Sequence, residues 1–98
     1  LDGYLDEVLP LGDIAAKMEA FGFDTVQVDG GDIVAVAAAL ERTRQGGGKP
    51  YAIVLDTIKG HGIAEAENTD RNHSMPVNDE RYARWMETLQ AELTALEE

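Results

Sequence analysis

The chain has 98 residues, which is enough for one hydrophobic core and too few for two. Its formal net charge of -11 leads us to expect no nucleic acid and no anionic membrane as a partner, because both would repel it. It has no cysteine and no apolar run long enough to cross a membrane, so we expect a cytoplasmic protein without disulfides.

The first part of the chain predicts a helix followed by a short strand. Apolar residues between Leu11 and Phe21 recur at intervals of three and four positions, which marks one buried face of a helix. Gly22 gives this helix a stop, because glycine readily adopts the conformation that ends helices. The β-forming residues that follow predict a strand from Thr25 to Val28, which ends near a glycine pair.

A second helix and a second strand follow in the same order. Asp32 is placed to cap the helix, and Arg42 and Arg44 fall in its last turn, where the helix dipole favours cations. The apolar run from Tyr51 to Leu55 predicts a strand buried on both faces of a parallel sheet. This alternation predicts an α/β fold, a parallel sheet with flanking helices joined by a right-handed crossover.

The last predicted element is a helix that begins near Asn78 or Asp79. Its apolar stripe includes Tyr82, Trp85 and Leu96 at helical spacing. We expect this stripe to face the core.

The stretch from Lys59 to Asn78 is polar and too long to be an idle connection in a compact domain. It directly follows the second predicted strand, and open parallel sheets bind ligands beyond the carboxyl ends of their strands. Lys59 offers a charge suited to a phosphate, while Gly60 and Gly62 would let backbone N–H groups approach a ligand oxygen. The candidate side chains are therefore Lys59, His61 and His73.

Spacing alone leaves other interpretations of this stretch open. It could be a flexible surface loop with a solvated lysine, and KGHG lacks the spacing of a Walker motif. His61 and His73 could be metal ligands, but no cysteine, HExxH helix or regular ligand spacing accompanies them, which argues against zinc. The many carboxylates show no pairing that selects a general acid and a general base, so surface solvation is their default role.

Several short stretches, taken together and in order, resemble the transketolase family. They are Leu1-Asp2-Gly3, Ala20 to Phe23, Val28 to Asp32, Lys49-Pro50, Thr57 to Gly62 and Asn72 to Asp79. The resemblance covers essentially the whole chain. It implies a partial thiamine diphosphate-binding fold, in which residues 1–98 form the C-terminal part of the N-terminal domain, or of the N-terminal subunit of a split transketolase.

The resemblance also implies an activity and partners. Transketolases use thiamine diphosphate and a divalent metal such as Mg2+ to move a two-carbon ketol unit between sugar phosphates, in the pentose phosphate pathway. The resemblance also leads us to expect either a homodimer or a partner subunit that carries the pyrimidine-binding domain. The family's metal ligands would lie upstream of Leu1, and the chain opens without an initiator methionine or a signal peptide. We therefore expect a fragment or a processed chain that is inactive alone.

The family's motifs assign roles to particular residues. Lys59 and Gly60 correspond to the loop near the cofactor diphosphate, and His73 to an active-site histidine near both cofactor and sugar, with a part in catalysis. His61 falls at a position that varies in the family, so substrate binding is its only expected role. Gly31 replaces a common histidine and Ser74 a common glycine, which affects the expected substrate preference.

Two alternatives to a transketolase stay open at the level of sequence. One is another thiamine diphosphate enzyme, such as a deoxyxylulose-phosphate synthase or a 2-oxo acid dehydrogenase relative. The other is a noncatalytic acidic interaction module that kept the fold, although it would not need to retain both Lys59 and His73.

Overall fold

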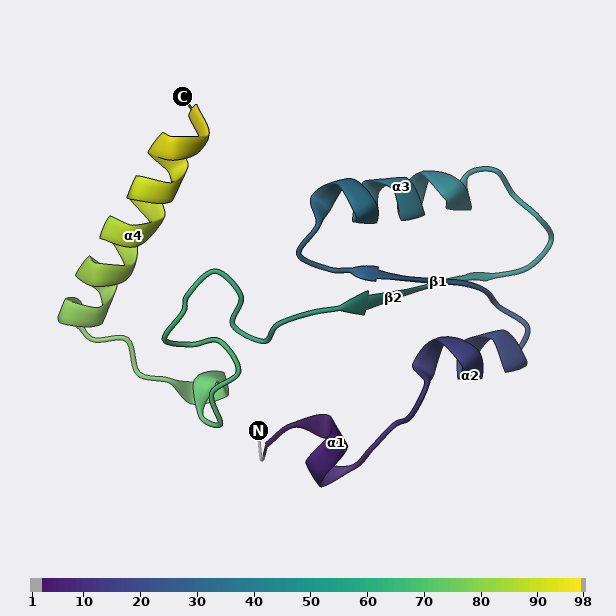
Figure 1. The fold of residues 1–98 in the computed structure, drawn as a ribbon, viewed down its shortest axis with the longest axis horizontal. Helices are drawn as coiled ribbons and strands as arrows, with labels where there is room; N and C mark the ends of the chain where they lie inside the picture. Colours follow the sequence, from purple (N-terminus) through teal and green to yellow (C-terminus); the bar gives the residue numbers. More distant parts are fainter. Residues whose placement is uncertain (1–2, 98) are drawn as a thin grey trace. The chain divides into compact units, whose positions relative to one another are not determined.

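The computed structural model describes residues 3–97, which form two compact units, residues 3–58 and residues 59–97 (Figure 1). We call them the strand unit and the loop-helix unit. The strand unit holds, in chain order, α1 (Leu5–Val8), α2 (Ile14–Ala20), β1 (Asp24–Asp29), α3 (Ile33–Thr43) and β2 (Tyr51–Asp56).

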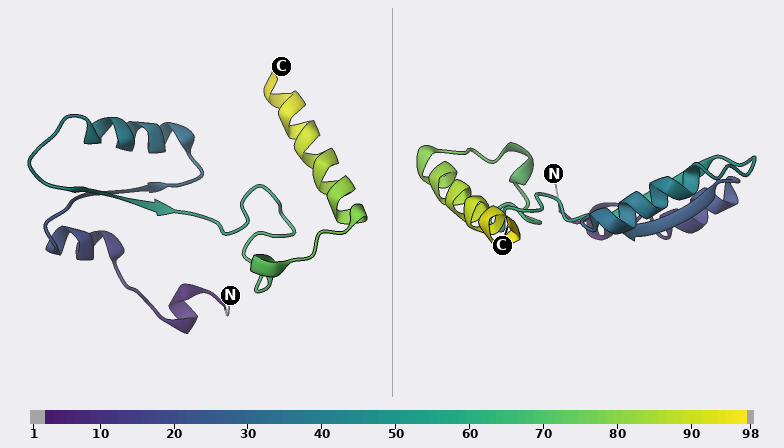
Figure 2. Two further views of the ribbon diagram at one scale, coloured as in Figure 1. Left: turned by 180° about the vertical axis from the view of Figure 1, so that it is seen from behind. Right: turned by 90° about the horizontal axis from the view of Figure 1, so that it is seen from above.

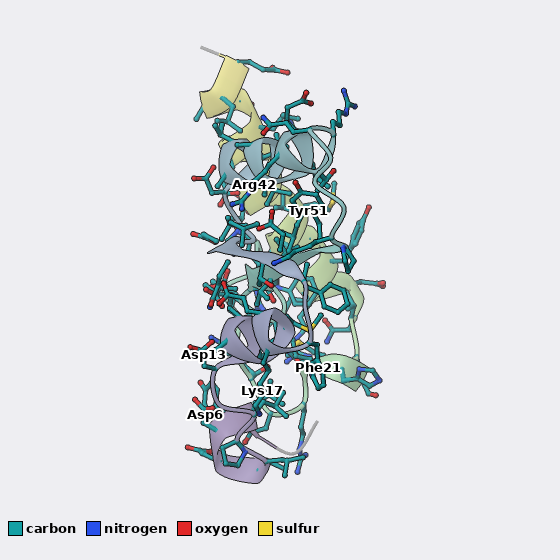
Figure 3. All side chains as sticks on the ribbon, turned by 90° about the vertical axis from the view of Figure 1, so that its right-hand side faces the viewer. Asp6, Asp13, Lys17, Phe21, Arg42 and Tyr51 are labelled. Atoms are coloured by element: carbon teal, nitrogen blue, oxygen red, sulfur yellow. The ribbon has the colours of Figure 1, made fainter. Side chains whose placement is uncertain are left out.

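The two strands of this unit are parallel and pair in register, with Thr25 opposite Ala52 and Val28 opposite Leu55. α2 lies on one side of the sheet and α3 on the other, as Figures 1 and 2 show. In the side view of Figure 3, Arg42 of α3 lies above the strands and Phe21, just after α2, lies below them. The predicted α/β fold, a parallel sheet with flanking helices, is confirmed.

Local capping explains where the two flanking helices begin. The Asp13 carboxylate accepts a hydrogen bond from the Ala16 amide at 2.9 Å, so α2 begins at Ile14 rather than at the predicted Leu11. Asp32 caps α3 as predicted, because its carboxylate accepts from the amides of Val34 and Ala35.

The loop-helix unit consists of a long loop, the 3-10 turn η1 (Asn72–Ser74) and α4 (Asp79–Glu97). The Asn78 side-chain oxygen accepts a hydrogen bond from the Arg81 amide at 2.9 Å, which fixes the predicted start of α4. The expected burial of the α4 stripe is not seen. Tyr82 is 59% exposed and Leu96 84% exposed, while Trp85 is half-buried.

Apolar side chains are exposed over much of the described chain. Among residues 3–97, Ala39 is the single buried apolar residue, and it is 6% exposed. Phe21 beside α2 and Ile33 at the start of α3 are each about four-fifths exposed. The strand unit by itself therefore leaves apolar side chains of its helices uncovered.

Candidate functional site

The candidate site is the 59–78 loop, the segment of the loop-helix unit that precedes α4. The loop closes on itself, because the Asn68 amide donates to the carbonyl oxygen of Lys59 at 3.0 Å. A tight turn lies inside it, in which the Ala66 amide donates to the Ile63 carbonyl at 2.7 Å. Such internal bonds satisfy backbone groups that helices and strands would otherwise pair. The loop is therefore a folded structure of its own.

Gly60 is required by a close approach inside this loop. Its φ is 81°, in the left-handed region, and a Cβ atom at this position would lie 2.5 Å from the carbonyl oxygen of Ala66. A side chain here would meet backbone, which has little freedom to move aside. The glycine of the KG pair is thus explained by packing within the loop, and its contact with a cofactor stays a prediction.

Asn72 joins three parts of the loop. Its side-chain Nδ2 donates to the Ala66 carbonyl at 2.7 Å and to the Lys59 carbonyl at 3.3 Å. Asn72 also begins η1, so His73 is its immediate neighbour in the chain. The arrangement fixes the backbone of Lys59 with respect to the backbone that carries His73.

The structure places the three predicted side chains in one unit. Lys59, His61 and His73 are all exposed. Among residues 3–97, neither Lys59 nor His73 forms an ion pair, so both keep their polar atoms available to solvent or ligand. Lys59 and His73 are connected through Asn72, whereas His61 belongs to a separate contact.

The separate contact of His61 is with Glu67. One of its carboxylate oxygens accepts a hydrogen bond from the Gly62 amide at 3.1 Å and lies 3.3 Å from Nδ1 of His61. The Gly62 amide, which the sequence suggested for a ligand oxygen, is therefore already paired within the protein. Within the described residues, the amides of Gly60 and His61 donate no hydrogen bond to a backbone carbonyl or to a side chain.

Glu65 attaches the loop to α4. Its carboxylate accepts hydrogen bonds from Arg81 Nε at 2.9 Å, Arg84 Nη2 at 2.8 Å and the indole N–H of Trp85 at 3.1 Å. Arg81 also donates to the Pro76 carbonyl at 2.8 Å, so it holds both limbs of the loop. The pKa of Glu65 is lowered, first by the Trp85 hydrogen bond and then by Arg84 and Arg81, while partial burial works in the opposite direction.

A second polar feature lies in the strand unit. A hollow of about 340 Å³ is lined by residues of the α2 start and of both strands: Gly12, Asp13, Ile14, Gln27, Val54 and Asp56. Across the sheet, the Gln27 amide donates to both carboxylate oxygens of Asp56 at 2.9 Å. Sequence reasoning did not single out these residues, and only the position of Asp56 at the end of a strand could have indicated them.

Residues 3–97 contain no group of three or more His, Cys, Asp or Glu side chains that could hold a metal ion. The helices of this part of the chain do not combine the length and apolarity needed to cross a membrane.

Fold and site together define a class of protein. The strand unit is a parallel β-α-β unit, and open parallel sheets of α/β proteins bind ligands beyond the carboxyl ends of their strands. Within this class, residues 1–93 match the family described as transketolase, thiamine diphosphate binding domain. The chain belongs to the transketolase family, as its motifs predicted.

Individual relatives support the same family. The 6-deoxy-6-sulfo-D-fructose transketolase subunit of Clostridium sp. (strain MSTE9) is 33% identical over 92 residues, 94% of this chain and 34% of that protein. One subunit of the apulose-4-phosphate transketolase from Actinobacillus succinogenes is 35% identical over 81 residues, 82% of this chain and 29% of that protein. Transketolase-like protein 2 of Bos taurus is 42% identical over 65 residues, 66% of this chain and 10% of that protein. The chain spans about a third or less of each.

Proposed function

We propose that this chain is part of a transketolase that transfers a two-carbon ketol unit between sugar phosphates with thiamine diphosphate. The observation that carries the proposal is the 59–78 loop, in which one hydrogen-bonded framework presents an exposed lysine and an exposed histidine. Family membership supports the cofactor class. We further propose that residues 1–98 form the C-terminal part of the cofactor-binding domain.

The loop has groups that suit the diphosphate of this cofactor. Lys59 brings a positive charge, and the amides of Gly60 and His61 are donors that the described residues leave unpaired. A chain of net charge -11 needs such a local basic site to hold an anion. When bound, thiamine diphosphate supplies the carbon nucleophile that carries the ketol unit.

Lys59 and His73 have different proposed roles. Lys59 acts as a fixed charge that binds a phosphate group, and His73 donates a hydrogen bond to the reacting sugar oxygen and moves a proton. His61 has a lesser role at the substrate, because Glu67 engages its Nδ1 side. Gly60 contributes through its backbone.

The complete assembly is also a proposal. Two of the relatives are named as transketolase subunits, which favours a partner subunit carrying the pyrimidine-binding domain, with a homodimer as the other arrangement. We propose that Mg2+ accompanies the cofactor and that its ligands precede Leu1 in the complete protein, which acts in the cytoplasm.

Steady-state kinetics on the complete enzyme tests these roles. Lys59→Ala should raise the apparent constant for cofactor or substrate more than it lowers turnover, and Lys59→Arg should restore part of the loss. His73→Ala should lower turnover by roughly 10²–10⁴-fold, as expected for an acid-base group.

His61→Ala is the matched control and should be mild. If it proves as damaging as His73→Ala, or if both Lys59→Ala and His73→Ala leave the kinetics intact, the assignment fails. A complete protein that binds the cofactor but transfers no ketol unit would favour another thiamine diphosphate reaction. One that binds no cofactor would favour the interaction module.

A further inference from the structure

Within the described residues, the side-chain amide of Asn72 makes the only direct hydrogen bond between the Lys59 backbone and the 3-10 turn η1, which carries His73. It spans 13 positions of sequence to the Lys59 carbonyl and 6 to the Ala66 carbonyl. Both partners are acceptors, so the side chain must present its nitrogen to them. Asn72 therefore acts as a donor at the centre of the loop.

We propose that Asn72 is a positioning residue, which holds Lys59 and His73 in a fixed relation by bonding the Lys59 carbonyl with its side chain and carrying His73 as its neighbour. The inference rests on the proposed function of Lys59 and His73. We assign Asn72 no contact with the cofactor or the sugar. It limits how far the two active groups can separate.

The oxygen of the Asn72 side chain differs from the nitrogen in its surroundings. Asn72 Oδ1 is buried and has no hydrogen-bond partner within the described residues. A buried unpaired acceptor costs stability, and the two hydrogen bonds that Nδ2 donates act against this cost. What the amide provides is a donor that reaches two carbonyls at once.

A contrast between two asparagines of the loop-helix unit gives a sharp test. Asn72 uses its nitrogen as a donor, whereas Asn78 uses its oxygen as an acceptor for the Arg81 amide. Asn72→Asp removes the donor and sets a carboxylate against two carbonyl oxygens. Asn78→Asp adds the same charge but keeps the acceptor, since aspartate and asparagine cap helices about equally well.

We expect Asn72→Asp to lower kcat/KM of the complete enzyme by roughly 10- to 100-fold, the cost of misplacing catalytic groups by about 1 Å, with Asn78→Asp within about twofold of the unchanged enzyme. Hydrogen exchange of amides 59–68 should be faster in Asn72→Asp and unchanged in Asn78→Asp.

The relative activity of Asn72→Asp should recover as the pH falls, because a protonated carboxyl can again donate to the Ala66 carbonyl. Combined with Lys59→Ala, its loss should be smaller than the product of the two single losses.

Two results would overturn the inference. One is an Asn72→Asp enzyme that matches Asn78→Asp in both kinetics and exchange. The other is faster exchange in Asn72→Asp with unchanged kinetics, which would make the amide purely structural.

If Asn72→Asp does not fold, Asn72→Ala serves with the same controls, since it removes the donor without adding charge. Should Lys59→Ala and His73→Ala both be fully active, the proposed function fails first, and the exchange data still decide whether Asn72 ties the loop.

Discussion

Single residues of the 59–78 loop show which parts of the candidate site can be predicted from the sequence. Lys59 and His73 could be selected because their residue types and their position after a strand both suit an anion. Asn72 and Glu65 were missed, because their partners lie 6 to 20 positions away and are carbonyls or side chains brought together only by the folded loop. No local pattern marks such a residue.

The two loop glycines should differ in their response to alanine. Gly62 has a φ of 93° and open space around its would-be Cβ, so Gly62→Ala meets only the left-handed strain of about 1–2 kcal/mol. Gly60→Ala adds a clash with the Ala66 backbone and should open the loop further. Limited proteolysis of the loop measures this, with the faster cleavage expected for Gly60→Ala. Equal rates would contradict the close approach.

Glu65 makes the contact between loop and α4 sensitive to acid. Its pKa is lowered in the folded protein from an ordinary value of 4.5, so the contact is fully stabilising above that pH and weakens as the pH falls through the lower folded value. Titration of the Glu65 carboxyl by NMR should show the lowered pKa. Trp85→Phe removes the largest cause and should raise it; a Glu65 that titrates at or above 4.5 would refute the contact.

Among the elements, both strands and the starts of α3 and α4 were predicted correctly. Asp32 and Asn78 cap α3 and α4 as their residue types indicate, and both strands contain the ranges expected for them. The pattern overextended α2, whose start is set by Asp13, and it did not identify α1. Short elements of this kind depend on one or two bonds, which periodicity over a longer window does not detect.

The cap of α3 should be measurable by itself. Asp32→Ala removes the acceptor of two amide hydrogen bonds and should destabilise the helix by about 0.5–2 kcal/mol. Asp32→Asn keeps an acceptor and should cost a few tenths at most. Hydrogen exchange of the α3 amides distinguishes them. Equal protection in both variants would mean that packing, not the cap, sets the start of α3.

At the scale of the whole molecule, sequence predicted the order of elements but not what covers them. Periodicity shows which face of a helix is apolar, as in α4, yet it cannot show whether the residues that bury this face belong to the same 98 residues. The exposed α4 stripe and the exposed Phe21 are the result. The predicted parallel direction of the strands is likewise correct, and the described residues contain two strands of the sheet.

Isolated, the 98-residue chain should unfold with little cooperativity. Little of its apolar surface is buried, so the burial that drives a sharp transition is small. Calorimetry should give a broad, weak transition, and a dye that binds apolar surface should bind strongly. A sharp thermal transition without dye binding would contradict this expectation.

The same chain should bind thiamine diphosphate weakly or not at all. The described residues supply donors for the diphosphate but no cluster of three or more metal-binding side chains. Titration calorimetry with and without Mg2+ measures this. Micromolar, magnesium-dependent binding would place the metal ligands within these residues.

The hydrogen bond between Trp85 and Glu65 has an optical consequence. Trp85 is the only tryptophan of the chain, and its indole N–H points to a carboxylate supplied by the loop. Indole emission depends on the charge and polarity around the ring, so the chain carries a native reporter at the junction of loop and α4. A ligand that rearranges the loop would change this emission, and the change could be followed in real time without attaching a label.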